Sequence, residues 1–230
     1  LTATALRVDL LVHYGHSCLV PMNPKAGLKV LYVFVDIKID PLHFIETIKF
    51  NFTNDIKIGL VSTIQFVATL QLVAKQLIED GYTVKVPQIK PLSPGEILGC
   101  TAPAIKCTDI IIYLGDGRFH LEAAMIANPS LQAYRYDPYD KTITKEYYNH
   151  EEMQTVRYKS VEQAKNATNF GLILGTLGRQ GSLKVLKHIE KRLKDSGKNV
   201  IIILLSEIYS GKLDLFDVDA FVQTACPRLS

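Results

Sequence analysis

The stretch of sequence that decides the fold is IGLVSTIQFVATLQLVAKQLIEDGYTVKV, residues 58–86. It begins with an apolar run at 58–61, continues with apolar residues at helical spacing over 65–79, and ends in a second apolar run at 83–86. Gly81 follows the expected helix as a C-terminal cap. A continuous apolar run is typical of a parallel strand that helices cover on both faces, so the stretch predicts a β-α-β unit.

The same order of elements returns nearer the C-terminus, where strand-like runs at 171–174 and 200–205 flank an expected helix at 182–194. The remaining patterns predict further strands at 9–14, 30–35, 110–114 and 220–223, and further helices at 41–50, 119–127 and 151–167. Strands and helices that alternate in this way are typical of an α/β fold with parallel sheets. We therefore expect repeated α/β domains.

Three repeats are expected in the chain. Residues 1–40 form the C-terminal part of an incomplete first repeat, 41–147 form the second and carry Cys100, and 148–230 form the third and carry Cys226. Each cysteine lies beyond the second strand of its repeat, in a loop at the edge where open α/β sheets place their functional groups. Equivalent loops from two repeats would bring the two cysteines toward one point.

The composition narrows the class of protein. With 47% hydrophobic and 21% charged residues among 230, the chain can bury a substantial core and is not mainly disordered. Its formal net charge is only +3 and no run of basic residues occurs, so no direct nucleic-acid binding is expected. No apolar run approaches the roughly 20 residues that cross a bilayer, and the first residues lack the pattern of a signal peptide. We therefore expect a cytoplasmic protein that binds no membrane.

Four cysteines, Cys18, Cys100, Cys107 and Cys226, are too few for a disulfide scaffold and form no CxxC pair. Cys100 lies in an irregular loop rich in glycine and proline, and Cys226 comes directly after an expected strand. A thiolate in such a loop, beside backbone N–H groups, suits an iron–sulfur cluster. The wide spacing alone leaves an alternative open, in which both are ordinary buried thiols.

A second candidate feature is the glycine-rich loop GTLGRQGS at 175–182, between an expected strand and an expected helix. Such a loop presents backbone N–H groups and a helix N-terminus to an anionic group, either a carboxylate or a phosphate. The spacing fits neither GxGxxG nor the P-loop, and a tight turn is the alternative. The candidate cofactor-binding residues are Gly175, Gly178, Gln180 and Gly181.

Two further sets of polar residues are candidates for chemistry. The strand-to-helix loop of the second repeat carries Asp116, Arg118 and His120, which could contact a substrate, although Asp116 is equally suited to cap the following helix. His16 and Cys18 lie close enough in sequence to act as a base and a nucleophile. Because no third residue that would orient them can be identified, a structural thiol is the favoured interpretation of Cys18.

Several long strings contain these motifs: VHYGHSCLVP at 12–21, PLSPGEILGCTAP at 91–103, YLGDGRFHLEAAMIAN at 113–128, GLILGTLGRQG at 171–181 and TACPRLS at 224–230. In these strings the chain resembles the diphthamide synthase family, in particular the catalytic first subunit of the eukaryotic 2-(3-amino-3-carboxypropyl)histidine synthases. The resemblance covers essentially the whole chain, and strings of this length are far more specific than the spacing of the cysteines.

The resemblance implies a fold, a cofactor and a reaction. The family has three similar α/β domains around a pseudo-threefold axis, each giving one cysteine to a [4Fe–4S] cluster, and Cys100 and Cys226 match those of the middle and last domains. The cluster binds and, when reduced, cleaves S-adenosylmethionine. The 3-amino-3-carboxypropyl group then passes, by an unusual radical mechanism, to a histidine of translation elongation factor two. The expected activity is therefore the first step of diphthamide biosynthesis.

The resemblance also implies partners: a related second synthase subunit in a heterodimer, a small iron-binding electron donor, and the elongation factor as protein substrate. The family's first cluster cysteine is expected upstream of Leu1, and the family continues beyond Ser230, so the chain is expected to be a fragment. The alternative is a noncatalytic partner or scaffold subunit of the same complex. A third possibility is a related iron–sulfur enzyme of small-molecule biosynthesis. The intact loops around Cys100 and Cys226 favour the transferase.

Overall fold

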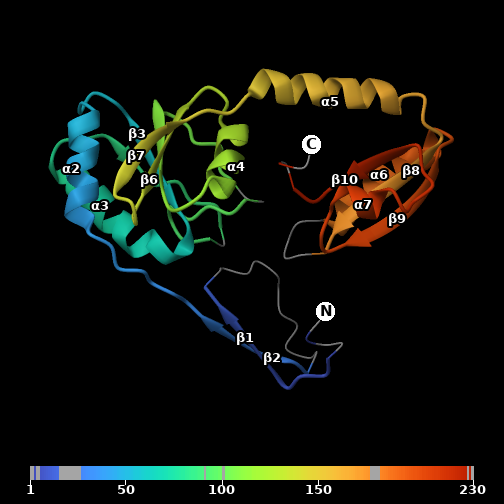
Figure 1. The fold of residues 1–230 in the computed structure, drawn as a ribbon, viewed down its shortest axis with the longest axis horizontal. Coiled ribbons are helices and arrows are strands. Elements are labelled where there is room, and N and C mark those ends of the chain that lie inside the picture. Colours follow the sequence, from blue (N-terminus) through green and yellow to red (C-terminus); the bar gives the residue numbers. More distant parts are fainter. Residues whose placement is uncertain are drawn as a thin grey trace. The chain divides into compact units, whose positions relative to one another are not determined.

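A computed structural model describes residues 3, 6–15, 27–90, 92–99, 102–176, 182–226 and 228 of the chain (Figure 1). The chain divides into two compact units, Leu1–Tyr148 and Asn149–Ser230. Six of the residues considered above lie outside the described residues: His16, Cys18, Cys100, Gly178, Gln180 and Gly181.

The larger sheet of the first unit contains five strands, in the order β4 (Val84–Lys85), β3 (Ile58–Ser62), β5 (Ile110–Leu114), β6 (Gln132–Asp137) and β7 (Thr142–Glu146). The first four run parallel, and β7 pairs antiparallel with β6. Every residue of β3 and β5 is buried, as expected for strands that are covered on both faces. The prediction of a parallel sheet around the quoted stretch is therefore confirmed.

Helices on both faces of this sheet explain the burial. One face is covered by α2 (Pro41–Asn51) and α3 (Val67–Glu79), which follows the 3-10 turn η2 (Ile64–Phe66), and the other by α4 (Phe119–Ala127) (Figure 1). Successive residues of β5 alternate between two core clusters, so that Ile112 packs with α2 and α3 and Tyr113 packs with α4. Each large apolar side chain buried in this way contributes about 1.5–3 kcal/mol to folding.

Local signals in the sequence fix the helix ends. Asp40 caps α2, because its Oδ1 accepts hydrogen bonds from the backbone N–H groups of Leu42 and His43 at 3.1 and 3.3 Å. Gly81 follows α3 with a φ of 89°, a left-handed conformation that glycine adopts without strain. The predicted C-terminal cap of that helix is thus confirmed.

The hairpin of β6 and β7 is absent from the sequence-based prediction. Its strands carry charged residues, and Arg135 of β6 pairs with Glu146 of β7 at 3.3 Å. Its turn places Lys141 at a φ of 53°, which is uncommon for a residue with a Cβ. Strands were predicted from apolar runs, whereas these two strands carry charged residues and their turn places a lysine where glycine is usual. The structure therefore adds β6 and β7 to the strands that the sequence predicts.

The second unit has a three-stranded parallel sheet in the order β10 (Ala220–Gln223), β8 (Asn169–Gly175) and β9 (Asn199–Leu205). The central strand β8 is buried from Phe170 onward. The helices are α5 (His150–Ala164), α6 (Leu183–Asp195) and the short α7 (Ser210–Leu213), which was not predicted. Leu186 of α6 packs on Leu172 and Leu174 of β8, so the predicted second β-α-β unit is confirmed.

A separate two-stranded sheet precedes α2. Its strands β1 (Leu10–Tyr14) and β2 (Lys29–Val33) run parallel, close to the predicted ranges 9–14 and 30–35. The fold is thus a mixed α/β fold with parallel sheets, as expected. The division into three repeats and the pseudo-threefold axis stay predictions. Within the described ranges, no helix has both the length and the apolar character that crossing a membrane requires.

Candidate functional site

In the second unit, the glycine-rich loop and the segment with Cys226 both start at the carboxyl ends of strands in one sheet. Gln223 of β10 lies in register with Ile173 of the neighbouring parallel strand β8. The carboxyl end of β10 therefore leads into the segment with Cys226 beside the point where β8 ends at Gly175. This edge, outside the carboxyl ends of the strands, is where open α/β sheets bind their ligands.

Cys226 is a free cysteine that is only 8% exposed. The side chain of Gln223 holds the backbone around it. Its Oε1 accepts hydrogen bonds from the N–H groups of Ala225 and Cys226 at 2.7 and 3.0 Å, and its Nε2 donates to the carbonyl oxygen of Cys226 at 2.9 Å. The thiol is thus carried by a residue whose backbone N–H and carbonyl groups are both bonded to Gln223.

Thr224 ties the same segment to the central strand. Its backbone N–H and its hydroxyl both donate to the carbonyl oxygen of Ile173, at 3.1 and 3.2 Å. Cys226 is therefore anchored both to β10, through Gln223, and to β8, through Thr224. A thiol with so little backbone freedom is suited to a fixed ligand position.

The segment that leads to Cys100 lies along the carboxyl end of β3. The N–H of Ser62 donates to the carbonyl oxygen of Gly95 at 2.8 Å, and the N–H of Ile97 donates to the carbonyl oxygen of Ser62 at 2.9 Å. Cys100 itself is outside the described residues, but the chain enters its loop from this strand end. Cys107 is free and exposed, and it precedes the amino end of β5. It therefore lies at the opposite ends of the strands from the segment that leads to Cys100.

Gly99 allows an aromatic ring to lie directly on the backbone beside Cys100. A Cβ atom at position 99 would overlap the ring of Phe119, with Cδ1 at 2.8 Å and Cζ at 2.9 Å. Contacts this short do not occur between real side chains, so only glycine fits unless the ring moves. Phe119, the first residue of α4, is half exposed and lies against the backbone at Gly99, the residue before Cys100.

Unpaired polar atoms are buried at the same strand end. Ser62 and Glu96 are 0% and 1% exposed, and neither Ser62 Oγ nor Glu96 Oε1 has a hydrogen-bond partner among the described residues. The other carboxylate oxygen of Glu96 accepts from the N–H of Ser93 at 3.0 Å. Because buried polar groups are almost always bonded, these two atoms leave hydrogen-bonding capacity beside the segment that leads to Cys100.

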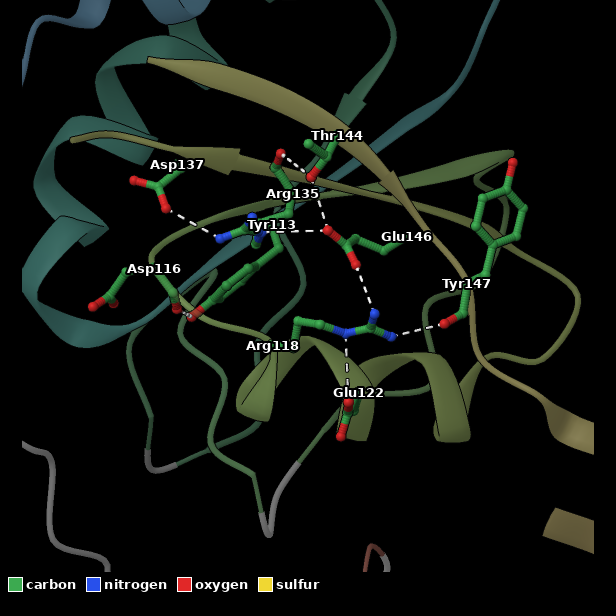
Figure 2. A network of polar contacts seen from close by, with 9 residues as sticks. All are labelled: Tyr113, Asp116, Arg118, Glu122, Arg135, Asp137, Thr144, Glu146 and Tyr147. Atoms are coloured by element: carbon green, nitrogen blue, oxygen red, sulfur yellow. Dashed lines mark hydrogen bonds and ion pairs between the residues drawn. The ribbon is translucent and has the colours of Figure 1, made fainter. Parts of the chain in front are cut away.

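Arg118, a candidate for substrate contact, is held by protein groups (Figure 2). Its guanidinium forms ion pairs with Glu122 at 3.5 Å and Glu146 at 3.3 Å, and donates to the carbonyl oxygen of Tyr147 at 2.8 Å. Glu146 also pairs with Arg135, which makes it the centre of the network. The geometry therefore gives Arg118 a structural task, joining α4 to β7.

The other candidates in this loop take different positions. Asp116 does not occupy the N-cap of α4, because that position belongs to Arg118, which forms no side-chain capping bond. The carbonyl oxygen of Asp116 accepts a long hydrogen bond of 3.5 Å from the hydroxyl of Tyr113 (Figure 2). His120 lies inside α4, where its ring packs edge-on against Phe119. The alternative that Asp116 caps the helix is therefore wrong.

Two buried tyrosines, Tyr113 and Tyr136, lie near the carboxyl ends of β5 and β6. Burial raises the pKa of Tyr113 well above its usual value of 10.0. Burial, with a smaller contribution from Asp40 and Asp137, raises the pKa of Tyr136 to about 12, and its hydroxyl lies 2.8 Å from His43 Nδ1. A raised pKa favours the neutral phenol, so both side chains are suited to hydrogen bonding within the fold.

An iron–sulfur cluster needs several cysteine ligands that lie together. No group of three or more potential ligands occurs among the residues that the structure describes. Cys226 nevertheless fits one corner of a cluster, because it is a free, buried thiol on an anchored segment. Its assignment, like that of Cys100 and of the four residues of the glycine-rich loop, stays a prediction.

These observations define a class: an α/β protein of parallel sheets that presents a thiol beyond its strand ends. The chain belongs to the family described as "Putative diphthamide synthesis protein", whose model matches residues 1–230. It is similar over its whole length to proteins named 2-(3-amino-3-carboxypropyl)histidine synthase subunit 1, with 63% identity to that of Nematostella vectensis and 56% to that of Homo sapiens. It covers 49% and 53% of those proteins, so it spans about half the length of the curated relatives it matches.

A solved structure shares the fold. The crystal structure of Dph2 from Pyrococcus horikoshii with a 4Fe–4S cluster matches with a TM-score of 0.79 and 26% sequence identity. The match covers 99% of this chain and 67% of the Dph2 chain. The expected family and the parallel-sheet α/β fold are therefore confirmed.

Proposed function

We propose that the chain is part of an S-adenosylmethionine-dependent 3-amino-3-carboxypropyl transferase, which modifies a histidine of translation elongation factor two in the first step of diphthamide biosynthesis. The observation that carries the proposal is 63% identity, over all 230 residues, to a protein named as subunit 1 of this synthase. The anchored free thiol of Cys226 adds support, because the similar Dph2 structure contains a 4Fe–4S cluster.

In this proposal Cys100 and Cys226 are two of the cysteine ligands of a [4Fe–4S] cluster. When bound and reduced, the cluster would supply one electron to S-adenosylmethionine, breaking a carbon–sulfur bond to give methylthioadenosine and the 3-amino-3-carboxypropyl radical. Addition of the radical to an imidazole carbon, with loss of one proton and one electron, completes the transfer. The task of Cys226 and its segment is to hold one thiolate in place.

The glycine-rich loop is proposed to hold the amino-acid part of S-adenosylmethionine through Gly175, Gly178, Gln180 and Gly181. Support comes from Gly175, which ends β8 beside the segment with Cys226. Backbone N–H groups ahead of a helix are suited to a carboxylate. Substitution of both Gly178 and Gln180 is expected to weaken binding of S-adenosylmethionine, and unchanged binding would remove this role.

The whole protein is proposed to work with others in the cytoplasm. The name "subunit 1" of its relatives points to a complex of more than one subunit. We infer a heterodimer with a related second subunit, a small iron-binding protein as electron donor, and the elongation factor as substrate. The pseudo-threefold arrangement of three α/β domains belongs to the same proposal.

Anaerobic cluster reconstitution of the full-length protein tests the proposal. Electron paramagnetic resonance after reduction is expected to show a [4Fe–4S] signal that Cys100→Ala and Cys226→Ala each abolish. Cys107→Ala is the matched control, because Cys107 is a free, exposed thiol at the opposite edge of its sheet, and it is expected to leave the signal unchanged. A signal indifferent to Cys100→Ala and Cys226→Ala, or no cluster at all, would favour the noncatalytic scaffold subunit instead.

A further inference from the structure

We propose that Gln223 is a positioning residue that fixes the direction in which Cys226 presents its thiol. The inference rests on the proposed function, since it concerns a ligand of the proposed cluster. It is carried by the three hydrogen bonds of the Gln223 side chain, two accepted from the N–H groups of Ala225 and Cys226 and one donated to the Cys226 carbonyl oxygen. Both backbone polar groups of Cys226 are thus bonded to one side chain.

The partners determine the orientation of the amide. Oε1 faces two N–H donors and Nε2 faces a carbonyl acceptor, so the reversed amide would set donor against donor and acceptor against acceptor. Glutamine is long enough to reach all three groups and is able both to accept and to donate. Glutamate keeps the two accepted bonds and loses the donated one, and leucine of similar size loses all three.

The position of Gln223 makes these bonds decisive for the thiol. It is the last residue of β10, and only Thr224 and Ala225 separate it from Cys226. Since Thr224 is bonded to Ile173, the strand end is fixed and the remaining freedom lies in the peptide groups on either side of Ala225. The Gln223 amide removes that freedom and keeps the N–H groups of Ala225 and Cys226 bonded to itself.

The same bonds limit what the cluster can receive from this segment. Hydrogen bonds from backbone N–H groups to cluster or cysteine sulfur shift the electronic structure and potential of an iron–sulfur centre. As long as Oε1 of Gln223 accepts from both N–H groups, these donors are not directed at sulfur. Loss of the amide would free two donors beside the ligand and loosen it.

The test compares Gln223→Leu and Gln223→Glu with the wild type in reconstituted full-length protein. Asn199→Leu is the matched control, because Asn199 also makes a side-chain amide hydrogen bond in this sheet, at 2.9 Å to Asn169, but at the amino ends of the strands. Three quantities are measured for each protein. They are the iron content after a chelator challenge, the electron paramagnetic resonance spectrum of the reduced cluster, and the melting temperature of the iron-free protein.

We expect Gln223→Leu to bind the cluster about 10- to 100-fold more weakly and to change its resonance spectrum, as loss of a ligand's supporting hydrogen bonds does. Gln223→Glu should lie between Gln223→Leu and the wild type, and Asn199→Leu should retain its iron and the wild-type spectrum. If Gln223→Leu fails to fold, Gln223→Glu carries the test.

Wild-type iron retention and an unchanged spectrum in both Gln223 variants would overturn the inference while leaving the proposed function intact. A change confined to the melting temperature would do the same, since it would show a purely structural role. A wild-type protein that takes up no cluster would overturn the proposed function and the inference together.

Discussion

Asp219 holds the starts of two strands together with a single carboxylate. Its Oδ2 accepts hydrogen bonds from the N–H groups of Thr168 and Asn169, at 2.9 and 2.7 Å, so the loop before β10 is bound to the start of β8. The N–H of Asn169, and then that of Thr168, lower the pKa of the carboxyl below its usual value of 3.8. A group whose pKa is lowered by folding stabilises the folded state above its unfolded pKa.

We expect Asp219→Ala to lower the melting temperature of the chain at neutral pH and to flatten its acid dependence. The stabilisation by Asp219 is complete above its usual pKa of 3.8 and is lost as the pH falls through the lower folded value, so the difference between variant and wild type should shrink below pH 3.8. Thermal unfolding followed over a pH series is the measurement. A difference that stays constant down to the most acidic samples would contradict this account.

At the scale of elements, the start of α4 packs against the backbone at Gly99, because glycine has no side chain there. Gly99→Ala places a methyl group against the ring of Phe119, so either the ring or the loop must move. We expect this variant to retain less iron after reconstitution than the wild type. Adding Phe119→Ala should restore much of the loss, because the smaller side chain vacates the space. Failure of the double variant to recover, while Phe119→Ala alone retains iron, would argue against the ring contact as the cause.

Glu146 connects β7 to both α4 and β6. Its carboxylate is only 9% exposed and pairs with Arg118 and Arg135, each at 3.3 Å (Figure 2). Glu146→Gln should lower the free energy of unfolding by about 1–3 kcal/mol, because two partly exposed guanidinium groups lose their shared carboxylate. Glu79→Gln is the control, since the pair of Glu79 with Lys75 is exposed, at 3.9 Å, and should cost no more than about 0.5 kcal/mol. Denaturant unfolding measures both, and equal effects would refute the assignment.

The same elements show what the sequence could predict. β3 and β5 were predicted because every residue in them is buried, so apolar runs identified them. β6 and β7 were missed because Arg135 and Glu146 are stabilised by pairing across strands, a contact that no local pattern reveals. At the candidate site, the two cysteine loops could be singled out from glycine, proline and strand ends. The hydrogen bonds of the Gln223 side chain could not be predicted, because nothing in the sequence distinguishes Gln223 from other strand residues.

At the scale of the whole molecule, the general course of the chain was predictable in both compact units. The alternation of strands and helices was right in both, because a parallel sheet requires a connection of many residues between its strands. The assignment of a family needed long strings of specific residues, such as those around Cys100 and Cys226, and the match over residues 1–230 confirmed it. Spacing and composition alone left open whether those cysteines are cluster ligands or two ordinary thiols.

The five-stranded sheet has two edges that offer little to a foreign strand. At one edge β4 has only two residues, and at the other β7 turns back antiparallel and carries Lys145 and Glu146. Unpaired N–H and C=O groups on a long apolar edge invite intermolecular pairing, whereas short or charged edges discourage it. In the folded sheet the two fully buried strands, β3 and β5, lie between neighbouring strands, so the edges exposed to other chains are the short and the charged ones.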